Sequence, residues 1–119
     1  MKHETPSPPA AADTAEWLDR AVERLVGRLD PEWVMLFGSY ARGTQSRTSD
    51  LDLFVVWETE LRPLERIGRV MEILSDSPRP LETVVYTPAE FERNRSIPFI
   101  RRILSEGRIL YGRARSGTS

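Results

Sequence analysis

The chain has 119 residues, enough for one small domain with a modest core but not for a catalytic domain with a separate substrate domain. Its net charge of −1 argues against recognition of a nucleic acid or a membrane by bulk charge. The lack of cysteine and the single histidine, His3, exclude disulfides, thiolate metal sites and a histidine-based zinc site.

The two ends of the chain are expected to lie outside the folded domain. Residues 1–13 are rich in proline and alanine and predict a disordered tail. Residues 14–112 are expected to form the domain, and residues 113–119 a second tail. No stretch is apolar enough to span a bilayer or to serve as a signal peptide, so we expect a cytoplasmic protein without a membrane partner.

The first predicted element is an amphipathic helix. Asp13 and Glu16 have the spacing of a capping box, and apolar residues then recur every three or four positions until Asp30-Pro31 ends the helix. The apolar run at residues 33–37 predicts a buried strand.

A single helical turn is predicted next, from Ser39 to Arg42, and Gly43 closes it. Residues 44–49 are expected to form a polar loop, and residues 50–57 a second strand. Pro63 fits the first turn of a helix that reaches about Leu74. The residues expected to face inward are Leu64, Ile67, Met71 and Leu74.

The last part of the chain predicts a strand, two short helices and an edge strand. Residues 81–86 form the strand, and Thr87-Pro-Ala-Glu90 combines a capping box with a proline suited to the first helical position. The apolar stripe of residues 91–104 is split near Ser96-Ile-Pro98, and residues 108–111 form the edge strand. This order predicts an α/β or α+β fold with a small mixed sheet of three to four strands flanked by helices.

Two aspartates at the start of the second strand carry the strongest functional signal. Alternate residues of a strand point to one face, so Asp50 and Asp52 are expected to project side by side. Two carboxylates this close both stay ionised only with a cation between them, and oxygen ligands favour Mg²⁺ or Mn²⁺. Taken alone, the pair could instead cap a neighbouring helix.

A glycine–serine pair lies between the first strand and the short helix. Gly38 would let a phosphate approach the backbone, and Ser39 and nearby N–H groups would bind that phosphate. Arg42 would neutralise phosphate charge, or form only a surface salt bridge. Ser49 would bind a phosphate or cap the strand. A phosphate cradle with a carboxylate-held metal is typical of nucleotidyl transfer.

A third carboxylate is expected on the neighbouring strand. Glu82 opens the third strand and would complete a two-metal site with Asp50 and Asp52, as a metal ligand or as the general base for the attacking hydroxyl. The alternative is an exposed glutamate at the edge of the strand.

The C-terminal part is rich in arginine, with seven between Phe91 and Arg115 against Glu92 and Glu106. Such a run is commonly a solvated helix face. It could instead form a basic surface that receives an acidic partner or a nucleic acid.

Phe37-Gly-Ser-Tyr-Ala-Arg-Gly43 followed by Ser49-Asp-Leu-Asp-Leu53 resembles the signature of the DNA-polymerase-β-type nucleotidyltransferase superfamily. The ending LETVVYTPAEFE resembles its minimal nucleotidyltransferase (MNT) branch, and the resemblance covers about residues 15–112. It implies that Gly38 and Ser39 bind nucleotide phosphates and that Asp50 and Asp52 bind Mg²⁺. Glu82 occupies the place of the third carboxylate, which is usually aspartate in that family.

The resemblance also implies a substrate and a partner. Members of the branch are often encoded beside a small helical HEPN-domain protein, as antitoxin and toxin. The expected activity is transfer of AMP from ATP to a tyrosine of that toxin, which silences its ribonuclease.

Two further hypotheses remain open. The acceptor could be a small molecule such as an aminoglycoside, with a pocket built between the subunits of a homo-oligomer. Alternatively, the chain could be a weak or inactive enzyme that neutralises its partner by stoichiometric binding. A polymerase role is disfavoured, because the chain lacks template-binding domains and a strongly basic charge.

Overall fold

A four-stranded mixed β-sheet forms the centre of the protein. The structure is a computed structural model, and it describes residues 11–46 and 49–112. The strand order is β3-β2-β1-β4. β2 runs parallel to β3, whereas β1 is antiparallel to both β2 and β4. The predicted fold class is therefore confirmed. The strand bounds are β1 (Trp33–Phe37), β2 (Leu51–Val56), β3 (Leu81–Tyr86) and β4 (Arg108–Gly112).

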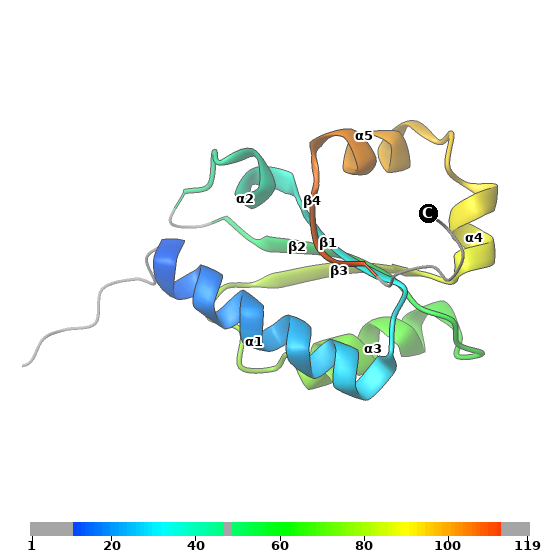
Figure 1. The fold of residues 1–119 in the computed structure, drawn as a ribbon, viewed down its shortest axis with the longest axis horizontal. Coiled ribbons are helices and arrows are strands. Elements are labelled where there is room, and N and C mark those ends of the chain that lie inside the picture. The colour runs from blue at the N-terminus through cyan, green and yellow to red at the C-terminus, as the bar shows by residue number, and fades with distance from the viewer. Residues whose placement is uncertain (1–10, 47–48, 113–119) are drawn as a thin grey trace, which may run out of the picture.

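Helices cover both faces of this sheet (Figure 1). On one face lie α1 (Ala11–Leu29) and α3 (Pro63–Ile73), and on the other lie α4 (Pro88–Arg93) and α5 (Pro98–Glu106). The short α2 (Gly38–Arg42) follows β1 directly. Within the described residues, none of these helices has both the length and the apolar character needed to cross a membrane.

Two apolar clusters pack against the two faces of the sheet. Leu51, Leu53 and Val55 of β2 belong to the cluster beneath α1 and α3, whereas Phe54 and Val56 belong to the cluster beneath α4 and α5. Because side chains alternate along a strand, Asp52, near the start of β2, also faces the α4/α5 side.

The start of α1 differs from the prediction. The helix begins at Ala11, so residues 11–13 belong to it rather than to a tail, and Asp13 lies inside the first turn instead of before it. The rest of the predicted tails, residues 1–10 and 113–119, lie outside the described residues.

The inward face of α3 was predicted wrongly in part. Leu64 is 81% exposed and Met71 is 38% exposed, while Arg66 is buried. The Arg66 guanidinium donates to both carboxylate oxygens of Glu90, at 2.7 and 3.2 Å. This ion pair lets an arginine occupy a position on the inner side of the helix, which apolar periodicity cannot anticipate.

Candidate active site

The turn between β1 and α2 touches the carboxylate of β2. Gly38 has a φ of +76°, a conformation that strongly favours glycine. A Cβ added at this position would overlap Asp52 Oδ2 and lie 3.1 Å from Asp52 Cγ. Residue 38 must therefore be glycine for two reasons, and the glycine–serine turn and the second aspartate form one site.

Two of the three predicted carboxylates, Asp52 and Glu82, lie on one rung of the sheet. Phe37, Asp52 and Glu82 are direct register partners across β1, β2 and β3. Directly opposite residues of neighbouring strands point to the same face, here the α4/α5 side. Asp50 lies two positions before Asp52, just ahead of β2, rather than inside the strand as predicted. All three acidic residues thus lie at the same end of the sheet.

The carboxylates of Asp50, Asp52 and Glu82 repel one another. The pKa of Asp52 is raised to about 6, first by burial of its carboxyl group, then by the charges of Glu82 and Asp50 and by a hydrogen bond with Glu82. The charge of Arg42 acts in the opposite direction. A group of this kind is stabilised by any cation that binds between the carboxylates.

The donor set suits Mg²⁺ or Mn²⁺ in its chemistry, because it offers carboxylate oxygens alone. Within the part of the chain that the structure describes, however, no three such side chains already converge tightly enough to hold an ion. Carboxylates can shift one another's pKa across several ångströms, whereas a bound Mg²⁺ needs each ligand oxygen at about 2.0–2.1 Å from the ion. The carboxylates are therefore neighbours that would have to draw together around a metal.

The polar loop between α2 and β2 is held by serine contacts. The Ser49 hydroxyl accepts a hydrogen bond from the Ser46 backbone N–H at 2.8 Å. The Ser39 carbonyl accepts the Thr44 backbone N–H at 2.9 Å, while Ser39 itself lies in the first turn of α2. The Ser49 hydroxyl also shares a 3.3 Å hydrogen bond with the Ser46 hydroxyl, in which either oxygen can donate. Ser49 thus shapes the loop that leads into Asp50.

Arg42 forms the surface salt bridge that was one of its two predicted roles, and its phosphate-binding role stays a prediction. Its guanidinium donates to Glu106 Oε1 of α5 at 3.4 Å, which is the surface ion pair weighed above. Its charge also reaches Asp52, whose pKa it lowers. Because both side chains are partly exposed, at 45% and 40%, the pair contributes little to stability.

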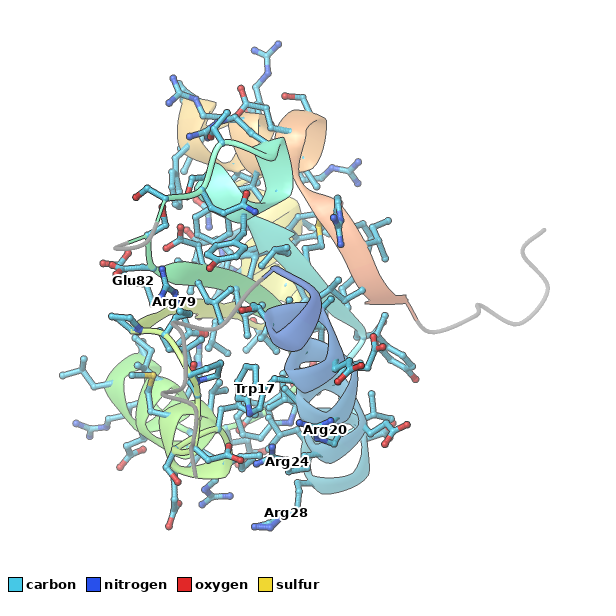
Figure 2. All side chains as sticks on the ribbon, turned by 90° about the vertical axis from the view of Figure 1, so that its left-hand side faces the viewer. Trp17, Arg20, Arg24, Arg28, Arg79 and Glu82 are labelled. Carbon is cyan, nitrogen blue, oxygen red and sulfur yellow. The ribbon has the colours of Figure 1, made fainter. Side chains whose placement is uncertain are left out.

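Arg79 is a residue that sequence reasoning missed. It is 9% exposed, and its guanidinium donates to the Ser46 carbonyl at 2.9 Å. It therefore ties the loop before Asp50 to the chain that enters β3, where Glu82 lies (Figure 2). Nothing in a turn rich in serine and proline signals a buried arginine, since its partner is 33 positions away.

Comparison with known proteins gives one family match and one curated relative. The family model "Polymerase beta, Nucleotidyltransferase" matches residues 21–116. A Methanocaldococcus jannaschii protein, described as a candidate protein adenylyltransferase, is 27% identical over 99 residues, covering 78% of this chain and 97% of that protein.

Three solved structures share the fold. A candidate nucleotidyltransferase from Sulfolobus solfataricus matches with a TM-score of 0.59 and 22% identity, covering 87% of this chain and 84% of that one. A mutant of the toxin–antitoxin MntA-HpeT matches with a TM-score of 0.62 and 23% identity, covering 81% and 72%. A toxin–antitoxin crystallised with AMP-PNP matches with a TM-score of 0.55 and 24% identity, covering 80% and 73%.

Proposed function

The chain belongs to the polymerase-β nucleotidyltransferase family, and from this premise we propose that it transfers AMP from ATP to a hydroxyl group of a partner protein. The observation that carries the proposal is the contact between the Gly38 turn and Asp52, on one rung with Glu82. Under this proposal, the turn that would bind the phosphates lies beside the carboxylates that would hold the metal. Nucleotidyl transfer needs both within the length of one triphosphate.

Each residue of the site has a proposed role. Gly38 and Ser39 would bind the triphosphate, Arg42 would leave Glu106 to neutralise it, and Ser49 would orient the loop and donate to a phosphate oxygen. Asp50 and Asp52, with Glu82, would hold Mg²⁺ or Mn²⁺. The bound metal would activate the attacking hydroxyl and stabilise the leaving pyrophosphate.

The bond changes are simple. The acceptor oxygen bonds to the α-phosphorus, the bond from that phosphorus to the bridging oxygen breaks, and pyrophosphate leaves. Glu82 would accept the acceptor proton, because it lies on the edge strand β3 beside Asp52. Its side chain is one methylene longer than the aspartate usual in the family, so the acceptor hydroxyl would sit slightly further from β3.

The relatives support a protein as the acceptor. The M. jannaschii relative is described as a candidate protein adenylyltransferase, and two of the similar folds come from toxin–antitoxin structures, one of them with AMP-PNP. The chain would act as an antitoxin, with a tyrosine of a small helical HEPN-domain toxin as the acceptor. ATP is the proposed nucleotide, and the reaction would take place in the cytoplasm.

Pyrophosphate release tests the proposal. The chain is incubated with ATP, Mg²⁺ and the purified product of the adjacent gene, and release should require all three components. Asp50→Asn with Asp52→Asn should abolish release, whereas Asp19→Asn, which removes an exposed carboxylate of α1, should not change it. Release that persists in the double variant would refute the assigned site.

Stoichiometric binding is the second candidate function. Ile97 and Phe99 at the start of α5 are 41% and 47% exposed, which suits contact with a partner. If the double variant still neutralises the partner fully, binding rather than chemistry is the function.

A further inference from the structure

A small cavity lies beside the carboxylate rung, between α2 and α5. Its volume is about 190 Å³, and its wall includes Phe37, Gly38, Phe99 and Ile103. Phe37 is the register partner of Asp52, and Gly38 is the residue that contacts the Asp52 carboxylate. The cavity therefore adjoins the proposed active site directly, on the same face of the sheet.

Two aromatic residues, Phe37 and Phe99, line the cavity. The rings of Phe37 and Phe99 pack edge to face, with centroids 5.9 Å apart and planes at 86°. Phe99 is nevertheless 47% exposed, although it is a large apolar residue at the first turn of α5. Because about half of the Phe99 side chain is exposed beside the cavity, its ring can pack against the aromatic ring of a ligand.

Charged groups stand around the apolar wall. Arg42, Arg102 and Glu106 also line the cavity, and Arg42 is paired with Glu106. The charge of the same arginine partly offsets the rise in the pKa of Asp52 that burial and the neighbouring carboxylates cause, so Arg42 lies near both the cavity and the carboxylates. If Arg42 leaves Glu106 to bind a triphosphate, the entrance of the neighbouring cavity becomes wider.

The size of the cavity limits what it can take. Pockets for drug-sized molecules measure about 300–1,000 Å³, so 190 Å³ is too small for a whole nucleotide and suits one ring system. We propose that this cavity is the nucleobase subsite, in which the base of the nucleotide packs on Phe99 while the triphosphate lies at Gly38. This inference rests on the proposed function.

The position of the cavity favours the base over a tyrosine ring of the acceptor. The cavity lies on the β1 side of Asp52, next to the turn and arginine assigned to the phosphates. Glu82, assigned to the acceptor hydroxyl, lies on the opposite side of Asp52, on β3. One reactant would thus enter from each side of the central carboxylate.

Comparison of two ligands tests the subsite. ATP and inorganic tripolyphosphate carry similar phosphates, but only ATP carries a base. Phe99→Ala should weaken ATP binding, measured by calorimetry with Mg²⁺, about tenfold or more, since base–aromatic stacking contributes about that much. Tripolyphosphate binding should stay unchanged, and Phe99→Trp should restore ATP binding. Leu64→Ala, which removes an exposed apolar side chain of α3 that does not line the cavity, is the control.

Three outcomes would overturn the inference. Equal weakening of ATP and tripolyphosphate by Phe99→Ala would mean that Phe99 only supports the local structure. Unchanged ATP binding with a raised KM for the acceptor protein would assign the cavity to the acceptor ring. Absence of ATP binding by the unmodified chain would reject the proposed function itself, and is thus distinct from failure of the subsite alone.

Discussion

At the scale of single residues, Asp52 connects stability with activity. Its raised pKa means that the folded protein binds a proton at Asp52 more tightly than the unfolded chain does. The stabilising effect of that proton is fully present below the unfolded pKa, 3.8, and is lost as the pH rises through about 6. At neutral pH, without metal, the ionised carboxylate therefore opposes folding.

Asp52→Asn should consequently stabilise the metal-free protein while abolishing transfer. The gain at neutral pH should be about 0.5–1 kcal/mol, allowing for solvent screening of a partly exposed group. Thermal melts in chelator should show a higher Tm for the variant at pH 7.5, and the difference should shrink as the pH falls through about 6. A variant that melts below the unmodified protein at pH 7.5 would contradict this view of the rung.

Gly38 and Gly43 form a matched pair. Their φ angles are +76° and +77°, but a Cβ at Gly43 would meet nothing within 4 Å, whereas one at Gly38 would overlap Asp52. Gly43→Ala should cost about 1 kcal/mol of unfolding free energy, because a side chain is strained in this conformation. Gly38→Ala should cost about 1–3 kcal/mol more, from the overlap.

Urea denaturation of both variants measures the difference. Combining Gly38→Ala with Asp52→Ala should recover most of the extra cost, because the overlapping carboxylate is then absent. Equal costs for Gly38→Ala and Gly43→Ala would show that Gly38 serves the turn alone and does not contact Asp52.

At the scale of elements, the Arg66–Glu90 pair joins α3 to α4. Glu90 has a lowered pKa, mainly because its carboxylate accepts hydrogen bonds from the Arg66 guanidinium. The stabilisation from a lowered carboxyl pKa is present above the unfolded value of 4.5 and is lost as the pH falls through the folded pKa. The pair should therefore add to the free energy of unfolding at neutral pH and add nothing in acid.

Glu90→Gln should cost about 2 kcal/mol at pH 7, because it leaves a buried guanidinium without its counter-charge. Glu92 provides the control, since its 3.2 Å pair with Arg95 is exposed, and Glu92→Gln should cost less than about 0.5 kcal/mol. Denaturation at several pH values should show the Glu90→Gln deficit closing below pH 4.5. A deficit that does not depend on pH would mean that the pair acts through packing.

Local sequence patterns predicted the elements well but not the contacts between them. The break before Pro98 and the turn at Gly43 follow from local prolines and glycines and are confirmed. The capping box at Asp13 misplaced the start of α1, which begins at Ala11. The inward face of α3 was partly wrong, because Arg66 depends on Glu90, 24 positions away. Arg79 was missed for the same reason, since its partner lies in a distant loop.

At the scale of the whole molecule, the sheet brings distant parts of the chain together at one end. Parallel pairing of β2 with β3 sets Glu82 beside Asp52, and antiparallel pairing with β1 sets the glycine turn against the same carboxylate. Sequence spacing already predicted the glycine–serine turn, the aspartate pair and Glu82 as parts of one site, at strands or strand ends. The contact between Gly38 and Asp52, and the cavity next to it, required the pairing register.

The site around Asp52 and Glu82 is proposed to transfer AMP to a partner protein. The most direct test is to co-express this chain with the product of the adjacent gene and to measure the intact mass of that product. We predict that the unmodified chain adds the mass of one or more AMP groups to that protein, and that Asp50→Asn with Asp52→Asn adds none. A stable complex without added mass would contradict the claim and would leave stoichiometric binding as the function.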